Sequence, residues 1–183
     1  PVRFFLSYAH KNSKLKDKLL DALRDELAIS RRFDFSIWED KGILVGNEWH
    51  REIQSALDEC DLCLSLLSPA FLASNYIVEH EIPPIVAREI PAIPVELEPL
   101  DLKRHNTRGL ENLQIFTPAF SKCTGNTSQK DFARKLAHKI EEKVAEEALA
   151  IAQRFAADYL SGKREARDLA DHHPELLGIL SEG

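Results

Sequence analysis

The stretch DLCLSLL, residues 61–67, is a short and nearly continuous apolar run. Such a run is typical of a strand that is buried on both faces at the centre of a parallel sheet. Ser68 and Pro69 follow it and predict the end of the strand, because proline has no N–H to give to a sheet. We therefore interpret residues 61–67 as the central strand of the fold.

Helical and strand-like patterns alternate on both sides of this segment. Leucines recur every four residues from Leu15 to Leu27 and predict a helix that begins near Asn12 or Ser13. Asn47 can cap a second helix whose inner face carries Trp49 and Ile53. This alternation predicts an α/β fold with a parallel sheet. The expected strands are residues 3–7, 33–38, 61–67, 92–97 and, as a weaker candidate, 113–116.

A long helix is expected in the last third of the chain. Ser128 and Asp131 open an apolar stripe that can continue to Ser161 and Gly162, roughly 30 residues or about 45 Å. A sheet of short strands needs less than this, so the excess predicts contact with a partner or a connection to another domain. We expect a domain core at 1–127, and at 128–183 its final helix, extended as a linker towards a further domain, with a short amphipathic piece at 174–180.

Composition excludes several classes of protein. Of the 183 residues, 44% are hydrophobic and 30% are charged, so a packed core is expected rather than disorder. No apolar run reaches about 18 residues, and the first residues lack the pattern of a signal peptide. The sequence contains no methionine and begins at Pro1, which suggests a piece of a longer protein.

Charge and cysteine content indicate the compartment and the partners. The net charge is −6, and residues 141–183, with ten acids and five bases, carry most of it. A nucleic-acid-binding domain would instead be basic, so no nucleic acid is expected as a partner. Three cysteines, Cys60, Cys63 and Cys123, fit a reducing cytoplasm and buried thiols. No metal is expected, since the histidines lack ligands at useful spacing, and no glycine-rich phosphate loop occurs.

Ligands of parallel α/β sheets bind beyond the carboxyl ends of the strands. In this sequence those ends are expected at residues 7–10, at 38–46, at 68–76 and after Leu97. These segments contain aromatic and acidic residues. Because the carboxyl ends of parallel strands lie at the same end of the sheet, we expect these residues to form one site.

Four segments resemble the Toll/interleukin-1 receptor (TIR) domain family, and bacterial members in particular. They are FFLSYAHKN (4–12), IWEDKGILVGNEWHREIQSAL (37–57), CDLCLSLLSPAFLASNYIVEHE (60–81) and IPVEL (93–97). The resemblance implies a flavodoxin-like fold, in which helices cover both faces of a five-stranded parallel sheet. It also implies cleavage of NAD+ into nicotinamide and ADP-ribose or cyclic ADP-ribose, with NAD+ as substrate and no cofactor.

The resemblance implies a catalytic glutamate a few positions after an aromatic residue, which here is Tyr76. Glu79 and Glu81 both lie near enough, and the five-position spacing of bacterial members favours Glu81. Loss of nicotinamide leaves positive charge on the ribose, and one carboxylate can stabilise it. Pro83 and Pro84, just after Glu81, are expected to disturb the helix there. The implied NAD+-contacting residues are Tyr8, Ala9, His10, Trp38, Asp40, Lys41, Gly46, Trp49 and Tyr76.

Structural roles remain open for several of these residues. Trp49 falls on a helical stripe, Trp38 ends a strand, and either could be core; Glu79 and Glu81 could merely match a helix dipole. The resemblance further implies self-association through the BB loop, whose tip is Ile43, Leu44 and Val45. The leading hypothesis is an antiphage effector controlled by a fused or associated sensor module. The alternatives are a non-catalytic TIR scaffold that docks other TIR domains and, much less favoured, a receiver domain.

Overall fold

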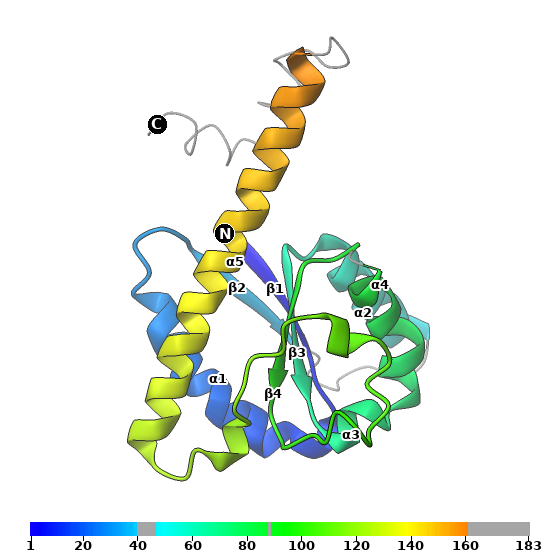
Figure 1. The fold of residues 1–183 in the computed structure, drawn as a ribbon, viewed down its shortest axis with the longest axis vertical. Coiled ribbons are helices and arrows are strands. Elements are labelled where there is room, and N and C mark those ends of the chain that lie inside the picture. The colour runs from blue at the N-terminus through cyan, green and yellow to red at the C-terminus, as the bar shows by residue number, and fades with distance from the viewer. Residues whose placement is uncertain (40–46, 88, 161–183) are drawn as a thin grey trace. The chain divides into compact units, whose positions relative to one another are not determined.

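The computed structural model of the protein describes residues 1–39, 47–87 and 89–160. Its strands and α-helices alternate along the chain, as the sequence pattern predicts (Figure 1). In order they are β1 (Val2–Ser7), α1 (Ser13–Ala28), β2 (Phe35–Glu39), α2 (Asn47–Glu59), β3 (Leu62–Leu67), α3 (Pro69–Leu72), α4 (Ile82–Val86), β4 (Ala92–Glu96) and α5 (Asn126–Leu160). A π-helical turn, Ile77–Glu81, leads directly into α4.

The strands form one parallel sheet in the order β2-β1-β3-β4. All six residues of β3 are buried, which confirms the interpretation of this run as a central strand. The register places Ser7, the last residue of β1, beside Ser65 of β3. The carboxyl ends of β1 and β3 therefore lie side by side at the same end of the sheet.

The expected five-stranded sheet is wrong in one respect, because the described residues form four strands. The segment expected as a fifth strand, 113–116, makes only an isolated parallel bridge between Phe116 and Val95. Its two hydrogen bonds join Phe116 N–H to the Pro94 carbonyl and Glu96 N–H to the Phe116 carbonyl. Extension in one direction would require the N–H of Pro94, and extension in the other the N–H of Pro118. Neither proline has an N–H, so the ladder stops after one bridge.

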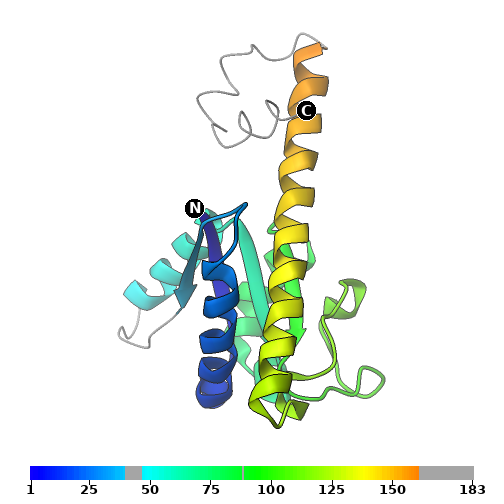
Figure 2. The ribbon, with the colours of Figure 1, turned by 90° about the vertical axis from the view of Figure 1, so that its left-hand side faces the viewer.

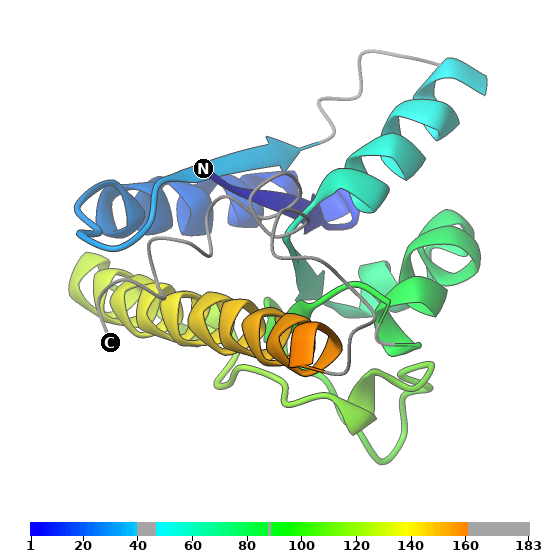
Figure 3. The ribbon, with the colours of Figure 1, turned by 90° about the horizontal axis from the view of Figure 1, so that it is seen from above.

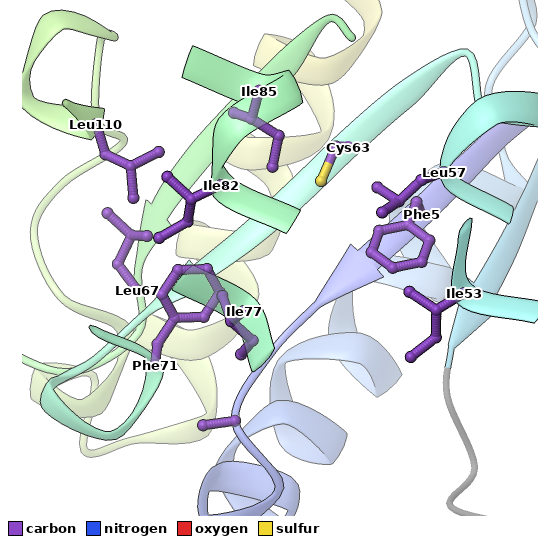
Figure 4. Close-up of a cluster of buried hydrophobic side chains, with 11 residues drawn as sticks. Phe5, Ile53, Leu57, Cys63, Leu67, Phe71, Ile77, Ile82, Ile85 and Leu110 are labelled. Atoms are coloured by element: carbon purple, nitrogen blue, oxygen red, sulfur yellow. The ribbon is translucent and has the colours of Figure 1, made fainter. Parts of the chain in front are cut away.

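Helices cover both faces of the sheet (Figures 2 and 3). Helices α2, α3 and α4 cover one face, and Figure 4 shows the apolar cluster beneath them. Helix α1 and the beginning of α5 cover the other face, where Phe132 of α5 contacts Phe116 and Phe120 edge-on. The cluster in Figure 4 consists of Phe5, Ala9, Ile53, Leu57, Cys63, Leu67, Phe71, Ile77, Ile82, Ile85 and Leu110.

The chain divides into two compact units, residues 1–141 and 142–183. Helix α5 contributes residues to both units and begins two residues before the expected Ser128. In the second unit, Ala152 and Phe155 form a small apolar cluster with Ala148 and Ile151. The helix end expected at Ser161 and the piece at 174–180 lie outside the described residues. Within the described part of the chain, no helix is long and apolar enough to cross a membrane.

Candidate functional site

A pocket of about 400 Å³ opens beyond the carboxyl end of β1. Ligands of parallel α/β proteins bind at this end of the sheet, beyond the carboxyl ends of the strands. The volume lies within the roughly 300–1,000 Å³ of small-molecule sites. Three segments contribute to its walls: the end of β1 with the residues that follow it, the first half of α2, and the chain from α3 to the π turn. The lining residues are Phe5, Leu6, Ser7, Tyr8, Ala9, His10, Lys11, Trp49, Ile53, Ala70, Ala73, Ser74, Tyr76, Ile77 and Glu81.

Glu81 is the acidic side chain among these lining residues, and it is only 5% exposed. The hydroxyl of Ser7, itself 1% exposed, donates a hydrogen bond to Oε2 of Glu81. A buried carboxylate is costly unless hydrogen bonds satisfy it. The Ser7 hydroxyl therefore stabilises the carboxylate and fixes its orientation in the pocket.

The backbone around Glu81 forms a π turn because of the sequence that follows it. The N–H of Ile82 donates to the carbonyl of Ile77, five residues earlier. Pro83 and Pro84 come next, and a proline ring clashes with the carbonyl four residues before it in a regular α-helix. The wider π turn relieves this crowding, and such turns often occur at functional sites. The helix disturbance that the prolines predict is thus a widened turn that ends at Glu81.

Aromatic side chains form one wall of the pocket. The rings of Trp49 and Tyr76 lie 4.3 Å apart between centroids, which joins α2 to the segment before the π turn. His50 Nδ1 lies 2.9 Å from the Tyr76 hydroxyl, within hydrogen-bond distance. The Tyr76 ring also contacts His80 at 4.7 Å. These contacts hold Tyr76 at the pocket, where its ring and that of Trp49 offer surfaces on which a flat heterocycle can stack.

An ion pair between Lys16 and Glu39 lies next to Tyr8, another of the lining residues. Lys16 of α1 is 6% exposed, and its Nζ donates to Oε2 of Glu39 at 2.6 Å. Arg24 donates to the other oxygen of Glu39 at 2.8 Å. Burial alone would raise the pKa of Glu39, but the hydrogen bonds and charges of Lys16 and Arg24 outweigh it and hold that pKa below its ordinary value. Lys16 Nζ also lies 4.9 Å from the centroid of the Tyr8 ring, so the pair braces a residue of the pocket.

The structure brings together six of the residues expected to form the site. Tyr8, Ala9, His10, Trp49, Tyr76 and Glu81 all line the pocket. Trp38 does not: it stacks on Phe5 at 5.1 Å and packs against the core cluster. Glu79 is exposed and is absent from the lining. Asp40, Lys41, Gly46 and the loop tip Ile43, Leu44 and Val45 lie outside the described residues.

Sequence reasoning missed Ser7 and Ser74 as residues of the pocket. Ser7 belongs to the quoted motif, and its position at the end of the first strand was the available signal. Ser74 is a lining residue in the loop after α3, and its hydroxyl lies 3.5 Å from the Ile77 N–H. Nothing in the sequence alone distinguishes Ser74 from an ordinary loop serine.

Cys60 and Cys63 belong to the core rather than to a reactive site. Burial raises the pKa of the Cys63 thiol well above its usual value, and burial together with Asp61 raises that of Cys60 to about 11. Both are therefore protonated at neutral pH, whereas a nucleophilic cysteine needs a lowered pKa. Among the residues that the structure describes, no cluster of three or more His, Cys, Asp or Glu side chains could hold a metal ion.

A parallel α/β domain with a carboxylate pocket at the carboxyl ends of its strands is the class that these observations define. The family model described as TIR domain matches residues 4–122, and the chain belongs to that family. The chain is also similar to an uncharacterized protein, y4lF, of Sinorhizobium fredii, with 31% identity over 101 residues. That alignment covers 53% of this chain and 30% of the length of the relative.

Proposed function

We propose that this TIR domain hydrolyses NAD+ at the bond between nicotinamide and ribose. The observation that carries the proposal is the buried carboxylate of Glu81, which lies in a pocket walled by aromatic rings and accepts a hydrogen bond from Ser7. The family spacing favoured Glu81 over Glu79 but kept Glu79 as the alternative. The proposal takes Glu81 as the catalytic residue, because its side chain lines the pocket and that of Glu79 does not.

The chemistry needs few groups from the protein. When the bond between C1′ and the nicotinamide nitrogen breaks, its electron pair leaves with the ring, which becomes neutral. No general acid is required, and positive charge develops on the ribose. A carboxylate held close to that charge stabilises the transition state more than the ground state. Water then adds its oxygen to C1′ and releases a proton, or a group of the adenine takes its place and gives a cyclic product.

The pocket residues take distinct parts in this proposal. Glu81 stabilises the ribose cation, and its carboxylate can also accept hydrogen bonds from the ribose hydroxyls. Trp49 and Tyr76 stack on a heterocycle, which in NAD+ is nicotinamide or adenine. Tyr8, Ala9 and His10, from the segment after β1, line the same pocket, and the proposal gives them the role of enclosing the reacting bond.

The proposal extends to assembly and biological setting. We infer that copies of the domain associate through the loop tip 43–45 and that assembly completes the site. The role that fits such a domain is that of an effector in bacterial defence against phage, triggered by a fused or associated sensor in the cytoplasm. This part rests on the resemblance to bacterial TIR domains.

The test measures nicotinamide released from NAD+ by protein immobilised at high density on beads. Glu81→Gln should lower the rate by about 100-fold or more, because it removes the charge while keeping the shape. Glu79→Gln is the matched control and should retain the wild-type rate. Loss of activity in the control alone would move the assignment to Glu79. Absence of release by the clustered wild type would favour the non-catalytic scaffold.

A further inference from the structure

A second pocket, of about 730 Å³, lies away from the candidate site, along the outer edge of the sheet. It runs between the end of α1 and strand β2, and we call it the β2 groove. Its lining residues are Arg24, Leu27, Ala28, Ser30, Arg31, Arg32, Phe33, Asp34, Phe35 and Ile37. The proposed NAD+ hydrolysis uses none of these residues.

The β2 groove follows an open strand edge. Strand β2 is the edge strand at one side of the sheet, next to β1 (Figure 3). Val2 N–H donates to the Asp34 carbonyl at 2.6 Å, so Asp34, Ser36 and Trp38 turn their backbone groups towards β1. Backbone groups alternate along a strand, and those of Phe35 and Ile37 therefore point outward. Among the described residues, none pairs with them on that side.

Apolar side chains border this edge. Phe33, Phe35 and Ile37 line the β2 groove together with Leu27 of α1. Ile29 follows α1 directly and is 75% exposed, the highest exposure among the large apolar side chains that the structure describes. An exposed edge with apolar surroundings is a site for strand addition, in which main-chain hydrogen bonds supply affinity and side-chain pockets supply specificity.

The charge of the β2 groove determines the kind of partner. Arg31 and Arg32 are exposed at the end next to the start of β2, and Arg24 is half-exposed further along. The Ser30 hydroxyl accepts from the N–H groups of Arg32 and Phe33, which fixes the turn that presents the arginines. Asp34 is the acidic residue of the lining, and Arg24 is already paired with Glu39, so Arg31 and Arg32 are the cations that a partner would meet.

We propose that the β2 groove binds an extended segment of a partner protein, with apolar residues along its centre and acidic residues at its ends. The segment adds as a fifth strand outside β2. Its backbone pairs with Phe35 and Ile37, its apolar side chains contact Phe33 and Leu27, and its acids meet Arg31 and Arg32. This interaction is independent of the proposed catalytic activity.

The test uses the synthetic peptide Glu-Glu-Val-Thr-Val-Thr-Val-Glu-Glu with a fluorescent label, and measures its anisotropy against the wild-type chain. Ile37→Pro removes an outward N–H that β1 does not use, and Ile37→Ala is the matched control that keeps the N–H. We expect the proline variant to bind about three- to tenfold more weakly than the alanine variant. The double variant Arg31→Glu, Arg32→Glu should also bind more weakly, and added salt should weaken the wild type.

Hydrogen exchange followed by NMR provides a direct readout of strand addition. The amides of Phe35 and Ile37 should gain protection when the peptide binds, while that of Ser36 is already protected. Equal binding by the proline and alanine variants, or equal binding of a peptide with lysine at every glutamate position, would overturn the proposal. A wild-type dimer that forms without peptide and that Ile37→Pro dissociates would assign the edge to a second copy instead and would also overturn it.

Discussion

The hydroxyl of Ser7, the last residue of β1, donates a hydrogen bond to Oε2 of Glu81, which follows 74 positions later in the chain. Both side chains are buried, and both line the same pocket. Ser7, at the end of β1, thus fixes the position of the Glu81 carboxylate at the end of the π turn. If Glu81 stabilises a cation on ribose, the orientation of its oxygens matters as much as their charge.

We predict that Ser7→Ala lowers kcat for NAD+ cleavage by about tenfold with little change in KM, because the carboxylate stays but loses its fixed orientation. Nicotinamide release measured over a range of NAD+ concentrations separates the two constants. Ser65→Ala is the control, since Ser65 lies beside Ser7 in the sheet and its hydroxyl is near the Cys63 sulfur at 3.5 Å. An unchanged kcat in the Ser7 variant would show that Glu81 needs no such positioning.

The ion pair of Lys16 with Glu39 should contribute to stability in a pH-dependent way. Glu39→Gln leaves the buried ammonium of Lys16 without its carboxylate partner on β2, and the free energy of unfolding at pH 7 should fall by about 1–3 kcal/mol. Urea denaturation followed by circular dichroism measures this difference. Asp17→Asn is the control, because Asp17 also contacts Lys16 but is 61% exposed, and its loss should cost less than about 1 kcal/mol.

The sign of the pH dependence follows from the pKa of Glu39, which lies below its ordinary value of 4.5. A carboxyl group with a lowered pKa in the folded state stabilises the fold above its unfolded pKa and loses that contribution as the pH falls. The stability difference between wild type and Glu39→Gln should therefore shrink as the pH drops below 4.5. A difference that persists undiminished far below this pH would contradict the role assigned to the ionised carboxylate.

Gly109 should tolerate no side chain. Its φ is +96°, and an added Cβ would lie 2.8 Å from a methyl carbon of Val86 in α4. Gly109→Ala should lower the free energy of unfolding by about 2 kcal/mol or more, from backbone strain and overpacking together. Thermal and urea denaturation measure the effect. Gly125→Ala is the control, since its Cβ would meet only the Ser128 hydroxyl at 3.9 Å, and we expect a change within about 0.5 kcal/mol.

A second substitution separates the two causes at Gly109. Val86→Ala in the Gly109→Ala background removes the clashing methyl groups but leaves the strained φ. It should recover the packing part of the loss only. Full recovery would mean that the left-handed backbone costs nothing here.

Apolar periodicity was sufficient to predict the four strands, the helices α1 and α2 and the parallel sheet, but not α3, which forms in a segment expected to be a loop. A local apolar pattern predicts one element at a time. It succeeded for β3, whose apolar run is buried at all six positions. The fifth strand failed because Leu-Gln-Ile-Phe is strand-like in itself, while pairing also depends on a neighbour. The missing N–H of Pro94 belongs to β4, and a reading confined to residues 113–116 does not include it.

The site was predictable to the extent that its residues lie at strand ends. Tyr8 and Tyr76 come from segments expected to converge, Trp49 comes from the start of the helix that follows a third such segment, and the pocket brings them together. The hydrogen bond from Ser7 to Glu81 required three-dimensional information, because no local pattern pairs two residues so far apart in sequence. The π turn also required three-dimensional information. Pro83 and Pro84 after it predict that the helix is disturbed, but they do not predict the geometry of the disturbance.

The two tryptophans should respond in opposite ways to substitution. Trp49 lines the pocket against Tyr76, whereas Trp38 stacks on Phe5 with an interplanar angle of 13° and is absent from the pocket lining. Trp49→Ala should raise KM for NAD+ by about tenfold, since a stacking surface for the heterocycle is lost. Trp38→Phe should instead lower the free energy of unfolding by about 1–2 kcal/mol and leave KM near the wild-type value. Steady-state kinetics and urea denaturation on both variants provide the comparison. An equal rise of KM in both would mean that Trp38 also reaches the substrate.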